Sequence, residues 1–295
     1  MKPKYMRLLR PIAWITFLFP FSIGFGLGVT SENNLFHVVF AFIAFTAWMS
    51  FCFVLNALAD KDVDKFHNGR SKDMNLAYQP LVTGEITGKE VLHLSMVFLF
   101  SSLLFAWLTG LLFFLLILIV DVLGYIYSMP PMRLKTKPVT DILCNALAAG
   151  IIFAAGLSIG GTNISVVMIS GAFIVACVFY IPTVITDYEF DKKAGLVTSA
   201  VFFGPKKLLQ AMYPLTAVAT LIWLTIFLTS GLELRVLALL VIIYTIVFTV
   251  VSNIKLKEKR LYLHENWILL PFAMTSTIFV IYGVLKLLGL LTPIG

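Results

Sequence analysis

The sequence predicts an all-α, multi-pass membrane protein with about nine transmembrane helices, arranged as two four-helix halves plus one further helix around a central cavity. Three observations predict this class. The chain is 60% hydrophobic and 13% charged and has a mean hydropathy of +0.96, which is more apolar than a soluble chain of 295 residues can bury. Apolar stretches long enough to span a bilayer recur from end to end. The basic residues gather in alternate loops.

Nine apolar stretches of about twenty residues each are expected to span the bilayer. Because they follow one another with only short polar breaks, residues 1–295 are expected to form one membrane domain. The first stretch is too long, and too closely followed by the second, for a cleaved signal peptide. The expected spans are Pro11–Thr30, Leu35–Leu58, Val91–Leu108, Leu111–Met129, Val139–Ile159, Ser165–Ile185, Leu208–Leu228, Val236–Val251 and Trp267–Leu288.

The positions of the basic residues predict the orientation of these spans. All but two of the 22 Lys and Arg residues precede the first span or follow the second, fourth, sixth or eighth, the exceptions being Arg235 and Lys286. The positive-inside rule places those segments, with the N-terminus, in the cytoplasm and Thr292–Gly295 outside. Membrane topology therefore explains most of the net charge of +7, and no nucleic-acid partner is expected.

Two groups of polar residues share one spacing and hold equivalent places in the order of the spans. On a helix every fourth residue faces nearly the same way, and like charges so placed repel each other, so a cation is expected between them. Matching aspartates of the two groups are 127 residues apart, as an internal duplication would give, and the groups are expected to face each other across the cavity. They are Asn56, Asp60 and Asp64 after the second span, and Thr183, Asp187 and Asp191 after the sixth.

Four carboxylates at one membrane face suit a hard divalent cation. Mg²⁺ takes oxygen ligands and commonly joins carboxylates to substrate phosphates, so these aspartates predict magnesium and a diphosphate substrate. Loops on the same face offer donors for phosphate oxygens, namely Arg70, Lys72, Arg133 and Lys135, of which Arg70 and Lys135 are the preferred candidates. The three cysteines lie in predicted spans without paired spacing, so neither a disulfide nor a zinc site is expected.

The aspartate motifs, together with three other segments, resemble the UbiA superfamily of intramembrane prenyltransferases, and its archaeal members most closely. The resemblance covers essentially the whole chain. The three segments are Gln79–Ile86, Tyr127–Lys135 with its Tyr-Ser-Met-Pro-Pro start, and Asp187–Gly195 with Gly204 beyond it.

The resemblance implies a magnesium-dependent enzyme of lipid biosynthesis. It would ionise a prenyl diphosphate and transfer the prenyl group, as an alkyl or aryl rather than a methyl group, to a lipophilic acceptor. Arg70 and Lys135 would contact the diphosphate. Tyr127 and Ser128 would lie near the reacting carbon. Gln79 departs from the family pattern, which often has arginine there. The ligands of two Mg²⁺ ions would be Asn56, Asp60, Asp64, Asp187 and Asp191.

Four other interpretations compete with this one. The aspartates could simply cap helix ends, or the chain could be a secondary transporter, in which intramembrane carboxylates also occur. A CDP-alcohol phosphotransferase would need D-G and A-R elements that the stretch from Asp60 to Gly88 lacks. A terpene cyclase on the same scaffold stays open. Asp121, within the fourth span, is expected to be a structural residue bonded to a tyrosine or to an asparagine such as Asn145.

The identity of the acceptor and the length of the donor are not encoded in any motif. A quinone precursor, an ether-lipid glycerol phosphate, a chlorophyll-type alcohol and a carotenoid all remain compatible with the sequence. The length of the donor tail depends on the depth of a cavity, which side-chain packing determines.

Overall fold

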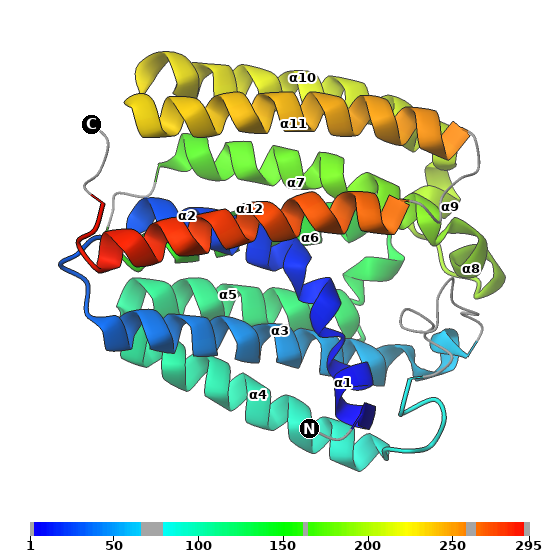
Figure 1. The fold of residues 1–295 in the computed structure, drawn as a ribbon. Helices are drawn as coiled ribbons and strands as arrows, with labels where there is room; N and C mark the ends of the chain where they lie inside the picture. The colour runs from blue at the N-terminus through cyan, green and yellow to red at the C-terminus, as the bar shows by residue number, and fades with distance from the viewer. Residues whose placement is uncertain (1–2, 66–78, 162–164, 258–263, 292–295) are drawn as a thin grey trace.

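The computed structural model describes residues 3–65, 79–161, 165–257 and 264–291, and in these ranges the chain is helical without any strand (Figure 1). Nine segments of the described chain are long and apolar enough to cross a membrane, so the predicted class is confirmed. The spanning helices are α2 (Ile15–Gly28), α3 (Leu35–Asp64), α4 (Gly88–Thr109), α5 (Leu111–Ser128), α6 (Thr140–Ser158), α7 (Val166–Thr186), α10 (Pro205–Thr229), α11 (Leu232–Lys257) and α12 (His264–Leu287).

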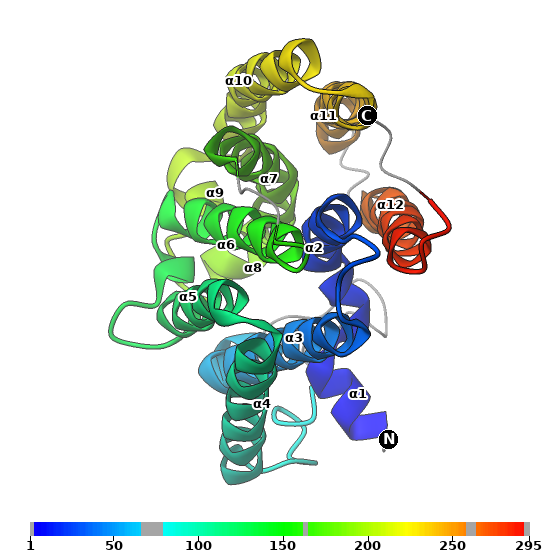
Figure 2. The same cartoon turned by 90° about the vertical axis from the view of Figure 1, so that its left-hand side faces the viewer.

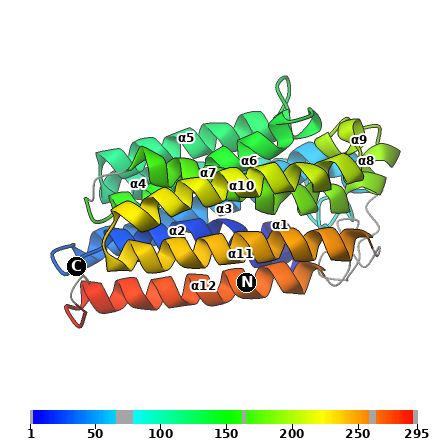
Figure 3. The same cartoon turned by 90° about the horizontal axis from the view of Figure 1, so that it is seen from above.

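Short helices precede the first span and connect some of the later ones, and Figure 3 shows α8 and α9 at the end of the bundle opposite the C-terminus. The first span includes two of them, since its apolar segment begins at Lys4. The short helices are α1 (Pro3–Leu9), the 3-10 helix η1 (Pro11–Trp14), the 3-10 helix η3 (Leu134–Thr136), α8 (Tyr188–Lys193) and α9 (Ser199–Phe203).

The long helices form two groups that α2 and α6 join (Figure 2). Helices α3, α4 and α5 pack on one another, and so do α7, α10 and α11. Helix α6 packs against α2, α5 and α7. Helix α12 packs on α2, so the last span lies beside the first. These contacts place three spans in each group, with α2 and α6 between the groups and α12 on α2.

Several helices extend beyond the spans that hydropathy predicts. Helix α3 was expected to end at Leu58 but continues to Asp64, and α11 runs from Leu232 to Lys257 rather than from Val236 to Val251. The backbone can keep its helical hydrogen bonds where polar side chains reach water, whereas hydropathy marks only the apolar part. The extension of α3 places the whole first aspartate motif on one helix.

Glycines allow α2 and α6 to pack with their backbones in contact. A Cβ atom added at Gly24 would clash with the carbonyl oxygen of Phe153, and one at Gly156 would clash with that of Phe21. Small residues spaced four apart are a common means of close packing between membrane helices. This contact fixes α2, and with it the segment that precedes α2, against the centre of the bundle.

We expect Gly156→Ala to destabilise the protein by about 3 kcal/mol or more, because the new methyl group meets backbone atoms that cannot rotate away. Thermal unfolding in detergent would measure this loss. Gly150→Ala is the matched control on the same helix, since its Cβ would lie at an ordinary 3.4 Å from the carbonyl oxygen of Ile169. Equal melting temperatures for the two variants would contradict the proposed role of the glycine contact.

Candidate active site

The first aspartate motif meets the segment that follows α5. Asp60 accepts hydrogen bonds from Lys135 at 2.6 Å and from Arg133 at 3.0 Å. The side-chain oxygen of Asn56 accepts from the same Lys135 at 2.6 Å and from the Ser128 hydroxyl at 3.4 Å. Charge-assisted bonds of this kind are roughly twice as strong as neutral ones. They join the end of α3 to the segment that the sequence singled out at Tyr127–Lys135.

The backbone after α5 brings the side chains of Arg133 and Lys135 back to α3. Helix α5 ends at Ser128, Arg133 adopts a left-handed conformation with φ 40°, and η3 then carries Lys135. Burial lowers the pKa of the Lys135 ammonium, an effect that the nearby Asp60 opposes and does not cancel. Lys135 is therefore a desolvated cation whose partners are Asn56 and Asp60, a suitable place for an anionic ligand.

The second motif is divided between two helices. Asp187 directly follows the last residue of α7 and precedes the first residue of α8, while Asp191 lies in α8. The backbone N–H of Asp191 donates to the carbonyl of Asp187 at 2.9 Å, so the expected helical turn between them is kept. The Thr198 hydroxyl, at the start of α9, donates to the Asp191 carboxylate at 2.9 Å. The connections after α7 thus hold the second motif at the end of the bundle.

Arg10 links the two motifs. Its side chain interacts electrostatically with Asp64 and Asp60 of the first motif and with Asp187 of the second. Helix α1 ends at Leu9 because Pro11 cannot continue its hydrogen bonds, and Arg10 turns the chain with φ 49°. One guanidinium therefore lies within electrostatic range of carboxylates from α3 and α7.

Backbone strain coincides with this site. In the described part of the chain, three residues other than glycine have positive φ, namely Arg10, Arg133 and Val139. The left-handed conformation costs a residue with a side chain roughly 1–2 kcal/mol, and such strain concentrates at functional sites, where the surrounding structure maintains it. Two of the three are the arginines that approach the aspartates.

A pair of tyrosines lies beside the second motif. The hydroxyls of Tyr127 on α5 and Tyr180 on α7 are 2.8 Å apart, and Asn145 of α6 lies beside Tyr127. Tyr180 lies within electrostatic range of Asp187. The structure therefore connects Tyr127, which the sequence singled out, to the second motif through a tyrosine that it did not.

The predicted residues are not assembled as a preformed metal site. Among the described residues, no three His, Cys, Asp or Glu side chains are close enough to hold one ion, and Lys135 and Arg133 engage Asp60 instead. Arg70 lies outside the described residues. Gln79 is buried, and its side-chain oxygen has no hydrogen-bond partner in the described structure.

The two other buried aspartates have structural partners. Asp121 accepts a hydrogen bond from Ser102 of α4 at 2.7 Å, so the expectation of a tyrosine or asparagine partner such as Asn145 was wrong. The expected partner lies on α6, whereas the observed one lies on α4, and the sequence pattern does not tell which neighbouring helix the carboxylate of Asp121 faces. Asp141 accepts hydrogen bonds from the side chain and the backbone of Ser199 and thereby joins α6 to α9.

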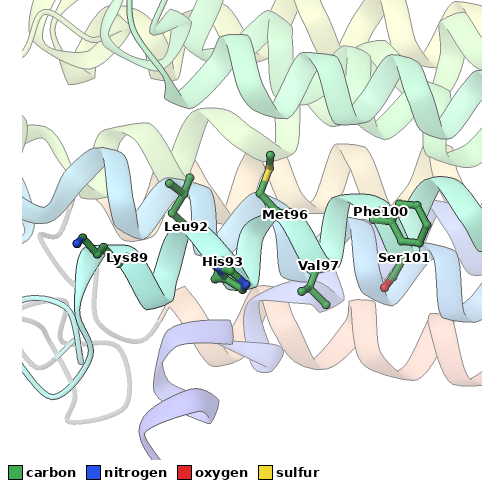
Figure 4. Close-up of a pocket in the computed structure, with 7 residues that line it drawn as sticks. All are labelled: Lys89, Leu92, His93, Met96, Val97, Phe100 and Ser101. Atoms are coloured by element: carbon green, nitrogen blue, oxygen red, sulfur yellow. The ribbon is translucent and has the colours of Figure 1, made fainter.

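A groove of about 630 Å³ lies elsewhere, along the outer face of α4 (Figure 4). It contains none of the residues singled out above. Its apolar members are largely exposed, as expected of a lipid-facing helix. The residues that line it are Lys89, Leu92, His93, Met96, Val97, Phe100 and Ser101.

Sequence reasoning missed Arg10, Tyr180 and Thr198 as members of this cluster. The charge pattern gave Arg10 a role in orientation only, although its place directly before Pro11 at the head of the first span was a usable signal. Arg133 was recognised as a possible phosphate donor and ranked below Arg70. Tyr180 and Thr198 had no sequence signal, because their partners lie on other helices.

Comparisons with known proteins agree with the fold. A model of the UbiA prenyltransferase family matches residues 17–267. The structure of a UbiA homologue from Archaeoglobus fulgidus bound to DMAPP and Mg²⁺ is 46% identical in sequence and superposes with a TM-score of 0.92. The match covers 96% of this chain and 99% of the homologue. The structure of an Archaeoglobus fulgidus UbiA homologue with GPP and Mg²⁺ gives 44% identity and the same TM-score, with the same coverage of both chains.

Curated relatives are more distant. A lycopene elongase/hydratase from Haloferax volcanii is 25% identical over 206 residues, which make up 68% of this chain and 65% of the relative. Another, from Haloarcula japonica, is 26% identical over 210 residues, 68% of this chain and 66% of the relative. The matched region thus spans slightly less than two thirds of each of these relatives.

Proposed function

The chain belongs to the UbiA prenyltransferase family, and we propose that it is an intramembrane enzyme that transfers the prenyl group of a prenyl diphosphate to a lipophilic acceptor. The ion pairs of Lys135 and Arg133 with Asp60 carry this proposal, and the Arg10 guanidinium lies within electrostatic range of carboxylates from both motifs. Acidic and basic groups together at one end of a membrane bundle fit an anionic ligand held through cations. If the aspartates only capped helix ends, acidic and basic groups from different helices would not need to lie close together.

The homologue structures support the donor and the metal. The proteins of 46% and 44% identity bind DMAPP or GPP together with Mg²⁺, so we assign a prenyl diphosphate as donor and magnesium as cofactor here. The curated relatives named lycopene elongase/hydratase support an apolar acceptor. A cavity within the bilayer would bring donor tail and acceptor together without water.

The donor set of the site fits magnesium. Carboxylate and amide oxygens are hard ligands, and Mg²⁺ prefers these together with water and phosphate. Bound magnesium, which we expect as two ions, would neutralise negative charge on the diphosphate. Lys135 and Arg133 also form ion pairs with Asp60. The residues that would hold the metal are Asn56, Asp60, Asp64, Asp187 and Asp191.

The basic residues of the chain would stabilise the leaving group. As the allylic C–O bond breaks, its electron pair leaves with the diphosphate, and Arg10, Arg133 and Lys135 are placed to compensate that charge. Arg70, singled out from the sequence, is assigned the same role. The acceptor then forms the new bond to the prenyl carbon and loses a proton. Tyr127 and Ser128 would line the region of that carbon.

We also propose that the site faces the cytoplasm. Cysteines placed at Lys65 and Lys193, which are both exposed, should react with a membrane-impermeant thiol reagent only after the inner face is opened, whereas one at Gly231 should react from outside. Labelling of Lys65→Cys and Lys193→Cys from opposite faces would separate the two aspartate motifs and overturn the shared site.

A non-reactive prenyl thiodiphosphate provides the direct test of the function. With Mg²⁺ it should raise the melting temperature of the protein in detergent by several degrees, since a ligand at a hundred times its Kd adds about 2.7 kcal/mol of stability. Inorganic diphosphate with Mg²⁺ should give a smaller shift, because it lacks the tail. A transporter would be stabilised by its solute without a prenyl group. No shift with the analogue in a folded sample would refute the proposal.

A further inference from the structure

The segment between the second aspartate motif and α10 carries an exposed surface of lysines and apolar side chains. Phe202 is 63% exposed and Val197 is 48% exposed. The rings of Phe202 and Phe203 meet edge to face, with centroids 4.9 Å apart. Figure 2 shows α9 at the outer edge of the bundle, beside α6 and α7. We call these exposed residues the α9 surface: Lys193, Val197, Phe202, Phe203, Lys206 and Lys207.

The α9 surface lies where the chain enters the bilayer. Helix α10 is a spanning helix that begins at Pro205, directly after α9 and the single residue Gly204. Exposed rings next to exposed lysines are typical of segments that lie in the plane of the membrane surface, with the rings among acyl chains and the ammonium groups among headgroups. The composition of the α9 surface therefore matches both parts of a lipid molecule.

Neither membrane orientation nor helix stability accounts for this surface. The positive-inside rule explains lysines in the connection but not the exposed rings between them. Lys206 and Lys207 lie in the first turn of α10, where a positive charge opposes the helix macrodipole. Within the described ranges, neither these two lysines nor Lys193 forms an ion pair with a carboxylate. Their charges are therefore available to an anionic partner.

The buried side of the same segment holds the second aspartate motif. Thr198 and Ser199 are 6% and 0% exposed. Thr198 donates to the Asp191 carboxylate at 2.9 Å, and the backbone N–H of Ser199 donates to Asp141 of α6 at 2.7 Å. Helix α9 has only five residues, whereas an isolated helix of fewer than about 12–15 residues is at best marginally stable. Contacts on the exposed side of α9 therefore help to keep these buried hydrogen bonds formed.

We propose that the α9 surface binds the headgroup of an anionic phospholipid, in the leaflet at the aspartate end, and thereby fixes the second aspartate motif. The ammonium groups complement the negative headgroup, and the neighbouring rings complement the acyl chains. Each lysine near an anionic membrane surface contributes about fivefold in affinity. A zwitterionic lipid offers the same acyl chains without the net charge. The effect on catalysis rests on the proposed function, whereas the binding of lipid does not.

The binding test uses the whole protein in detergent and measures the Kd of short-chain phosphatidylglycerol and of phosphatidylcholine with the same chains. Phosphatidylglycerol should bind at least about tenfold more tightly in 0.15 M salt, and much of this difference should disappear in 1 M salt, where the Debye length is about 3 Å. Combining Lys206→Gln with Lys207→Gln should weaken the binding of phosphatidylglycerol by about twentyfold. Phe202→Ser should weaken the binding of both lipids.

Three results would overturn the proposed lipid site. The first is equal affinity for the two lipids. The second is inorganic phosphate that binds as tightly as phosphatidylglycerol, which would indicate a site for free phosphate. The third is a nitroxide at Phe202→Cys that neither oxygen nor a soluble nickel chelate can reach in a bilayer, since another protein or a second copy would then cover the surface.

The consequence for catalysis is tested in nanodiscs that hold a single copy of the protein. With a prenyl diphosphate and an acceptor, kcat/KM should be severalfold higher in discs that contain phosphatidylglycerol than in discs of phosphatidylcholine alone. The variant with Lys206→Gln and Lys207→Gln should lose this increase and keep the activity of the unmodified protein in phosphatidylcholine. Lys89→Gln and Phe100→Ala, at exposed positions of α4, are the matched controls and should keep the increase.

The two readouts separate this inference from the proposed function. Activity that does not depend on phosphatidylglycerol, or that depends on it equally in the double lysine variant, would overturn the link between the α9 surface and the second motif. An absence of activity in every bilayer would refute the proposed function, while the Kd values for the two lipids would still decide whether the lipid site exists.

Discussion

Replacing Asp60 by asparagine is expected to reduce turnover of a prenyl diphosphate by at least about a hundredfold, the scale seen when one electrostatic contact to a transition state is removed. Asp60 combines two roles. It is a proposed magnesium ligand, and it is also the partner of Lys135 and Arg133. Asparagine keeps the size and one oxygen but loses the charge. Diphosphate release measured against Mg²⁺ concentration would give kcat/KM, and a chelator should abolish the activity of the unmodified protein.

Asp62 provides a matched control on the same helix. Its side chain is 87% exposed and pairs with Lys65 at 2.6 Å, so Asp62→Asn should keep near-normal activity, because exposed ion pairs contribute about 1 kcal/mol at most. Asp187→Asn, in the second motif, should behave like Asp60→Asn. Full turnover by Asp60→Asn would disprove the assignment of a metal to these carboxylates, and so would full turnover by the unmodified protein in excess chelator.

Replacing Arg10 by alanine should have the second-largest effect, a loss of about a hundredfold in kcat/KM. Two consequences are expected because Arg10 interacts with carboxylates of both motifs. Binding of the thiodiphosphate should weaken. The metal-free protein should also melt earlier, since the carboxylates lose a counter-charge, and Mg²⁺ should then raise the melting temperature more than in the unmodified protein.

Arg10→Gly separates charge from backbone conformation. Glycine adopts the observed φ of 49° without strain, so this variant should be more stable than Arg10→Ala and equally impaired in activity. Arg7→Ala is the control for a nearby arginine, because Arg7 pairs with Glu85 at a half-exposed position. A normal kcat/KM for Arg10→Gly would show that Arg10 does not contribute to the activity of the site.

The sequence predicted the parts of this protein that depend on local pattern. Hydropathy identified nine spans because each helix must satisfy its own backbone hydrogen bonds in lipid. The fourfold spacing identified Asp60, Asp64, Asp187 and Asp191 because one helix face repeats in that way. The segment Tyr127–Lys135 was identified by resemblance, and the structure places Lys135 and Ser128 against the first motif.

Only the tertiary structure decided which residues from different helices meet. Arg10 was one of many basic residues in the sequence, and its approach to both motifs depends on a left-handed turn after α1 and on a glycine contact between α2 and α6. Tyr180 and Thr198 had no sequence pattern that distinguished them from the residues around them. Their roles follow from packing between segments far apart in the chain, and helical periodicity records which face a side chain occupies but not which helix that face will meet.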